Sequence, residues 1–172
     1  GWFTHPAIQD LQDGIDKTSN FGTLDIIAAL EWVNNNISLF GGDSENITIF
    51  GESAGGHNVL SLLVSSKAKG LFNKAISMSG YTTSISQKDA YKPEKKSNTS
   101  SYSSWSVVNK IIKNKSYGKE QSYFSNKEIR DILYSLSEEE FYGFYSEREN
   151  YEEIPLLTDD GLVIPSIGLR KA

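Results

Sequence analysis

The chain has 172 residues, which is enough for one domain with a buried core. Lys and Arg number 17 against 22 Asp and Glu, giving a formal net charge of -5 that argues against nucleic acid as a partner. No apolar run approaches the length of a membrane span, and the absence of cysteine excludes disulfides and thiolate metal ligands.

The first third of the chain contains one strongly periodic segment. Residues 1–19 show no sustained periodicity and are predicted to form a surface loop. Residues 24–39 repeat apolar side chains at near-helical spacing, with Thr23 placed to cap the start of a helix. The glycines that follow Phe40 can adopt the positive φ that ends a helix.

The next segments alternate between strand and helix patterns. Residues 46–50 combine β-branched and aromatic side chains and are predicted to form a strand. A buried helix is predicted over 53–66, and a second strand over 74–78. Helix, strand, helix and strand in this order predict parallel pairing in an α/β sheet, with a functional site at its carboxyl edge.

The second half has weaker patterns. Residues 84–104 have low hydrophobicity and are predicted to be a loop or a poorly ordered insertion. Three helices are predicted, over 105–112, 127–133 and 138–145. Ser137 and Glu140 have the spacing of a capping box at the start of the last helix. The tail 154–165 is predicted to be a β-like run broken by a tight Asp-Gly turn.

The sequence Gly-Glu-Ser-Ala-Gly-Gly stands between the first predicted strand and its following helix. A Gly-x-Ser-x-Gly pattern at such a junction is typical of a nucleophile elbow, in which Gly51 and Gly55 lack a Cβ so that strand and helix can approach. The turn would present the Ser53 hydroxyl for attack and the N–H of Ala54 as an oxyanion donor. By itself the short motif also fits a glycine-rich turn with a capping serine.

Further blocks surround this motif in a fixed order. They are Asn-Phe-Gly-Thr-Leu-Asp at 20–25, Ala-Leu-Glu-Trp-Val at 29–33, Phe-Gly-Gly-Asp at 40–43, Thr-Ile-Phe-Gly-Glu-Ser-Ala-Gly at 48–55, Gly-Leu-Phe at 70–72 and Ala-Ile-Ser-Met-Ser-Gly at 75–80. Together they closely resemble the type-B carboxylesterases of the α/β-hydrolase fold, the group that also holds the cholinesterases. Asp160-Gly161 with Pro165 is similar to the later Asp-Gly-x-x-x-Pro segment of that family.

The resemblance implies a partial α/β-hydrolase fold with an incomplete sheet, formed by the elbow strand and helix plus a helical, cap-like region. Its match is dense from about residue 1 to 81 and thin between 85 and 125. We therefore expect a single partial domain over 1–172. Its three segments are the core with the elbow at 1–83, a variable insertion at 84–126, and helices with the Asp-Gly-x-x-x-Pro block at 127–172.

The resemblance also implies roles for individual residues. Ser53 would be the nucleophile that accepts the acyl group, and the N–H of Ala54 one oxyanion donor. Glu52 matches a glutamate beside the nucleophile, and Ser79 matches a serine that supports the acidic member of the triad. Pairing with a cation would explain Glu52 equally well, and capping of a strand end would explain Ser79. This chemistry acts on a small-molecule ester and needs no metal or other cofactor.

The catalytic machinery is incomplete in the sequence. Serine hydrolysis in this fold needs an acid and then a histidine after the serine. The chain has two histidines, of which His5 precedes Ser53 and is expected to be structural. His57 lies four residues after Ser53 on the same helix, so we expect it to be partly buried and not to act as the base. We expect an internal segment of a longer esterase, without the triad acid, the histidine or the Gly-rich oxyanion loop, and inactive alone.

A second interpretation is a cholinesterase-like protein that has lost catalysis and serves in binding or adhesion. The intact Gly-Glu-Ser-Ala-Gly favours the enzyme, because a binding module does not need an exposed serine on a strained turn. The sequence defines neither the oligomeric state nor the compartment, which can be cytoplasmic or secreted.

Overall fold

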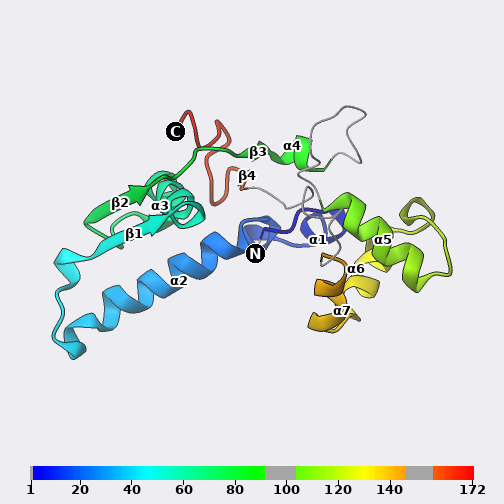
Figure 1. Cartoon of the computed structure of the whole chain (residues 1–172), viewed down its shortest axis with the longest axis horizontal. Coiled ribbons are helices and arrows are strands. Elements are labelled where there is room, and N and C mark those ends of the chain that lie inside the picture. The colour runs from blue at the N-terminus through cyan, green and yellow to red at the C-terminus, as the bar shows by residue number, and fades with distance from the viewer. Residues whose placement is uncertain (1, 92–103, 146–156) are drawn as a thin grey trace. The chain divides into compact units, whose positions relative to one another are not determined.

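The computed structural model describes residues 2–91, 104–145 and 157–172 (Figure 1). The chain divides into two compact units. Unit 1 consists of Gly1–Trp2, Asn20–Ser86 and Leu157–Ala172, and unit 2 of Phe3–Ser19 and Gln87–Leu156. The division into segments 1–83, 84–126 and 127–172 of one domain stays a prediction.

Unit 1 is built on a β-α-β unit. Strands β1 (Thr48–Glu52) and β2 (Lys74–Met78) pair in parallel, with registers running from Thr48↔Lys74 to Glu52↔Met78. Helix α3 (Ala54–Val64) connects them and packs on both strands (Figure 1). The predicted parallel α/β arrangement is confirmed, although β1 begins and ends two residues later than expected.

Helix α2 (Phe21–Asn36) continues as a 3₁₀ helix over Ile37–Phe40. Gly41 ends it at φ 82, as predicted from the glycines after Phe40. The expected cap at Thr23 is wrong, because the helix begins at Phe21 and the fully buried Thr23 lies inside its first turn. The Thr23 hydroxyl instead accepts a hydrogen bond of 3.3 Å from the indole of Trp2.

A second pair of strands joins distant segments of unit 1. Strand β3 (Ile85–Ser86) pairs in parallel with β4 (Thr158–Asp159). The predicted β-like run over 154–165 is therefore only two residues long in the described part, and residues 154–156 lie outside the described residues. The Asp-Gly turn is present, with Gly161 at φ 71 and its N–H donating to the carbonyl of Ile164 at 2.8 Å.

Asn20 anchors β4. This fully buried amide donates to the carbonyl of Thr158 at 2.8 Å and to Oδ2 of Asp160 at 2.9 Å. Its Oδ1 accepts the N–H of Thr158 at 3.0 Å, so both backbone groups of Thr158 are satisfied by one side chain.

We expect Asn20→Ala to lower the free energy of unfolding by about 3 kcal/mol, because it removes three hydrogen bonds of a buried side chain, although the Thr158 carbonyl keeps the Asp160 N–H at 2.9 Å. Asn36→Ala is the matched control, since the Asn36 amide bonds the Trp32 carbonyl at an exposed site and its loss costs about 0.5 kcal/mol or less. Urea unfolding of the purified chain measures both. Equal losses in the two variants would contradict the anchoring role.

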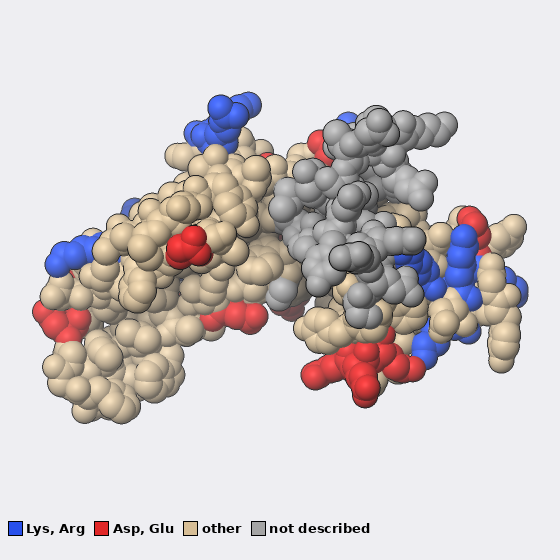
Figure 2. All heavy atoms as spheres, viewed as in Figure 1, with Lys and Arg blue, Asp and Glu red and all other residues tan. Residues whose placement is uncertain are grey.

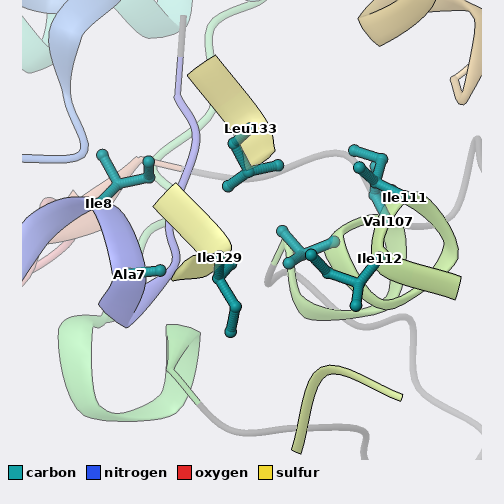
Figure 3. Packing of buried hydrophobic residues seen from close by; sticks show 8 residues of the cluster. Ala7, Ile8, Val107, Ile111, Ile112, Ile129 and Leu133 are labelled. Carbon is teal, nitrogen blue, oxygen red and sulfur yellow. The ribbon is translucent and has the colours of Figure 1, made fainter. Parts of the chain in front are cut away.

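Unit 2 is helical in its described residues. Its helices are α1 (Pro6–Gln9), α4 (Gln87–Ala90), α5 (Trp105–Lys115), α6 (Asn126–Tyr134) and α7 (Glu138–Gly143). The core gathers apolar side chains from α1, α5 and α6 (Figure 3), namely Ala7, Ile8, Val107, Val108, Ile111, Ile112, Ile129 and Leu133. The three helices predicted between 105 and 145 are confirmed, while residues 92–103 of the predicted insertion lie outside the described residues.

The surface loop predicted over 1–19 is wrong. This segment forms α1 and a 3₁₀ helix over Gly14–Lys17, and α1 packs against α6. Ala7 and Ile8 are buried there. A helix of four residues is too short to produce a periodic pattern, so the sequence carried no signal of its burial.

Capping boxes define the starts of α6 and α7. The predicted box of Ser137 and Glu140 is confirmed, and Ser125 with Glu128 forms a second one. Acidic side chains gather at α7 (Figure 2), whose first turn holds three glutamates, and this placement complements the positive end of the helix dipole. The Lys115 ammonium lies 2.7 Å from Glu140 Oε1.

His5 is buried in unit 2 in its neutral form. Its Nδ1 accepts the N–H of Ala7 at 3.1 Å, so the ring proton is assigned to Nε2, which donates to Gln121 Oε1 at 3.2 Å. The ring lies 4.8 Å from that of Trp105. Burial lowers the pKa of His5 from 6.5 to about 4, because the imidazolium would lose its hydration.

This pKa predicts a loss of stability in acid. Above pH 6.5 His5 is neutral in both the folded and unfolded chains, and between pH 6.5 and about 4 only the unfolded chain binds the proton. The wild type should therefore lose roughly 3 kcal/mol across this window relative to His5→Asn, which keeps a capping oxygen but does not titrate. Urea unfolding of both proteins at several pH values measures it, and parallel pH profiles would contradict it.

Candidate active site

Ser53 forms a sharp turn between β1 and α3. Its backbone has φ 52 and ψ -113, a conformation that favours glycine and costs a serine about 1–3 kcal/mol. The carbonyl of Ser53 accepts the N–H of His57 at 3.0 Å and so begins the helix. Ser53 is exposed, at the end of a strand and the start of a helix. This is the strand, turn and helix geometry of a nucleophile elbow.

Ala54 and Glu52 flank this turn and are both exposed. Ala54 is the first residue of α3, where N–H groups have no acceptor within the helix and the helix dipole is positive. An oxyanion that forms beside Ser53 could accept the Ala54 N–H. Glu52 is the last residue of β1. The roles of both residues stay predictions.

Of the two glycines predicted to lack a Cβ for steric reasons, only Gly51 has no room for one. A Cβ at Gly51 would collide with the carbonyl group of Gly55, so β1 and α3 can meet only if Gly51 has no side chain. A Cβ at Gly55 would meet no heavy atom within 4 Å in the described residues. Gly55 therefore contributes its backbone to the contact, and the expectation that it must lack a Cβ is not supported by this geometry.

A second glycine contact escaped the sequence interpretation. A Cβ at Gly56 would lie 2.8 Å from the Cα of Gly80 and 2.8 Å from the carbonyl oxygen of Met78. The hydroxyl of Ser77 donates to the Gly56 carbonyl at 3.1 Å. The glycine doublet at the start of α3 was the available signal, because glycine inside a helix is unfavourable unless close packing requires it.

Ser79 lies beside Ser53 at the carboxyl edge of the sheet. The register pairs Glu52 with Met78, and the Ser53 N–H donates to the Met78 carbonyl at 2.9 Å. Ser79 follows β2 directly, is exposed and also has φ 52. Each of the two parallel strands is thus followed directly by a serine with φ 52. The proposed support of a triad acid by Ser79 stays a prediction.

The side chain of His57 is engaged away from the nucleophile. Its Nε2 bonds the Thr83 carbonyl at 2.9 Å, and its ring lies 4.2 Å from the Tyr81 ring. Burial lowers the pKa of His57 below 6.5, and 6% of the residue is exposed. The only hydrogen bond between Ser53 and His57 in the described residues joins their backbones, and the expectation that His57 is not the base stays a prediction.

Neither a metal site nor a membrane-spanning helix is found where the structure describes the chain. Within residues 2–91, 104–145 and 157–172, no group of three or more His, Cys, Asp or Glu side chains could hold a metal ion. No helix in these same ranges is both long and apolar enough to cross a membrane.

The β-α-β unit with a strained serine at its elbow is part of a partial α/β-hydrolase fold, which the chain shares with solved esterase structures. A family model described as "Carboxylesterase family" matches residues 12–157. The chain therefore belongs to the carboxylesterase family, as its resemblance to the type-B carboxylesterases predicts.

Individual relatives agree with this assignment. A para-nitrobenzyl esterase of Bacillus subtilis is 52% identical over 73 residues, which are 42% of this chain and 15% of the relative. Carboxylesterase 1E of Rattus norvegicus is 61% identical over 61 residues, 36% of this chain and 11% of the relative. The chain thus covers less than a sixth of each of these relatives.

Solved structures extend the match over nearly the whole chain. A PNB esterase structure superposes with a TM-score of 0.67 at 27% identity, covering 96% of this chain and 30% of that protein. A carboxylesterase of Geobacillus stearothermophilus gives a TM-score of 0.64 at 30% identity, covering 95% of this chain and 30% of that protein.

Proposed function

We propose that this chain is a segment of a serine carboxylic-ester hydrolase in which Ser53 is the nucleophile. The observation that carries the proposal is the exposed, strained position of Ser53 at the start of α3 in a member of the carboxylesterase family. The Ser53 oxygen attacks the ester carbonyl, a base takes the hydroxyl proton, and the alcohol leaves. Water then releases the acid from the acyl-enzyme and restores Ser53.

The Ala54 N–H donates to the oxyanion of each tetrahedral intermediate. Ser79 supports the acidic member of the triad from the neighbouring strand end, and Glu52 places a carboxylate beside the nucleophile. The substrate class is a small carboxylic ester, in keeping with the para-nitrobenzyl esterase among the relatives.

The 172-residue chain alone is proposed to be inactive. Its histidines are His5 and His57, and the structure engages one with Gln121 and Ala7 and the other with Thr83. Without a base, Ser53 should turn over esters on the order of a million-fold more slowly, by comparison with triad knockouts in a serine protease. Rapid hydrolysis of a p-nitrophenyl ester by the purified chain, lost in Ser53→Ala, would contradict this proposal.

Fluorophosphonate labelling of the complete protein tests the proposal directly. An enzyme should react covalently at Ser53, which mass spectrometry of the labelled peptide identifies, and prior boiling should prevent the reaction. A folded complete protein that remains unlabelled would instead support the non-catalytic, cholinesterase-like binding or adhesion protein.

A further inference from the structure

The turn at Ser53 is held against residues 77–83, the last two residues of β2 and the five that follow, which we call the post-β2 segment. The N–H of Ser53 donates to the Met78 carbonyl at 2.9 Å, and the Ser77 hydroxyl donates to the Gly56 carbonyl at 3.1 Å. The backbones of Gly56 and Gly80 approach so closely that neither position has room for a Cβ. Three contacts therefore join the first turn of α3 to the end of β2 and the residues after it.

His57 adds the contact that lies furthest along this segment. Its backbone N–H bonds the Ser53 carbonyl at 3.0 Å, while its Nε2 reaches the Thr83 carbonyl at 2.9 Å. Because a carbonyl can only accept, Nε2 must carry the proton of this hydrogen bond. The ring also packs at 4.2 Å on Tyr81. One residue thus connects the elbow to two positions of the post-β2 segment.

The strained backbone conformation of Ser53 and Ser79 explains why these contacts are needed. Ser53 and Ser79 both have φ 52, which costs each of them free energy and persists only where the surroundings enforce it. The contact between Gly56 and Gly80 is made by backbone atoms alone, and the Ser77 hydroxyl bonds it from the β2 side through the Gly56 carbonyl. His57 spans this contact, with its ring on one side chain and its hydrogen bond on a carbonyl three residues beyond Gly80.

We propose that His57 is a positioning residue for the nucleophile, holding the post-β2 segment against the first turn of α3 and so fixing Ser53 relative to Ser79. The inference rests on the proposed role of Ser53. The role assigned to His57 is to hold the post-β2 segment through its Nε2–H donation to Thr83, and this role requires no proton transfer to or from substrate.

Three variants of the complete protein test this role through the rate constant of fluorophosphonate labelling. His57→Phe keeps a ring against Tyr81 but removes the donor to Thr83, and should slow labelling about 10- to 100-fold, because small displacements of a nucleophile have effects of this size. His57→Gln restores a donor of similar reach and should recover the rate to within about 3-fold. Leu62→Ala, at a buried site of α3, should lower stability and leave the labelling rate unchanged.

With p-nitrophenyl acetate, His57→Phe should lower kcat while KM changes by less than about 2-fold. Labelling of His57→Phe at the wild-type rate, or equal slowing in Leu62→Ala, would overturn the inference. If His57→Phe does not fold, Tyr81→Leu removes the ring contact at a half-exposed site, and an unchanged labelling rate there would also overturn it. Absence of labelling in the wild type would instead refute the role of Ser53 itself.

Discussion

Ser53→Ala in the complete protein is expected to lower kcat for ester hydrolysis on the order of a million-fold, the size of effect seen when the nucleophile of a serine protease is removed. Alanine keeps a Cβ, and the backbone at φ 52 and ψ -113 stays as strained as it is with serine. Stability should therefore change little, and the loss of activity can be assigned to the missing oxygen. Steady-state kinetics with a p-nitrophenyl ester and thermal unfolding measure the two effects.

Ser53→Gly separates catalysis from backbone strain. This variant should be as inactive as Ser53→Ala but about 1 kcal/mol more stable, because glycine adopts this backbone conformation without a steric penalty. A fall in activity of less than about 100-fold in both variants would remove Ser53 as the nucleophile. Equal stability of the alanine and glycine variants would show that the turn is not strained.

The elements predicted with good bounds are those whose signal is local. The strand at 74–78 is found where its β-branched and apolar run lies, and the capping box of Ser137 and Glu140 is set by a spacing of three residues. Gly41 adopts the positive φ that ends the helix before it. The turn at Ser53 also has a local signal, because a strand pattern, a glycine-flanked serine and a helix pattern follow one another directly, although β1 lies two residues later than the predicted strand.

The features that escaped prediction depend on partners far along the chain. The residue directly before α2 is Asn20, and not Thr23 as predicted. The Asn20 side chain bonds Thr158, 138 residues away. Gly56 needs its bare Cα because Gly80 packs on it from a different strand end. The glycine doublet marks Gly56 as a position of close packing, but no local pattern identifies Gly80 or Thr158 as the partner, so contacts of this kind require coordinates.

The close meeting of β1 and α3 gives the largest expected effect on folding. Gly51→Ala should destabilise the chain by several kcal/mol or prevent its folding, because the added Cβ would collide with backbone atoms of Gly55 that cannot rotate away. Either strand or helix must then shift, and the hydrogen bond between the Ser53 N–H and the Met78 carbonyl is lost with the shift. Soluble yield and urea unfolding of the purified chain measure this loss.

Gly55→Ala is the matched control two residues beyond the serine. Its Cβ would meet no heavy atom within 4 Å in the described residues, and alanine inside a helix is about 1 kcal/mol more favourable than glycine. We therefore expect Gly55→Ala to leave stability unchanged or to raise it. Of these two substitutions placed symmetrically about Ser53, only Gly51→Ala should destabilise the chain, and equal losses in both would show that the strand and helix approach each other differently. The two substitutions differ because the Cα of Gly51 faces the helix, whereas Gly55 faces the strand with its carbonyl group.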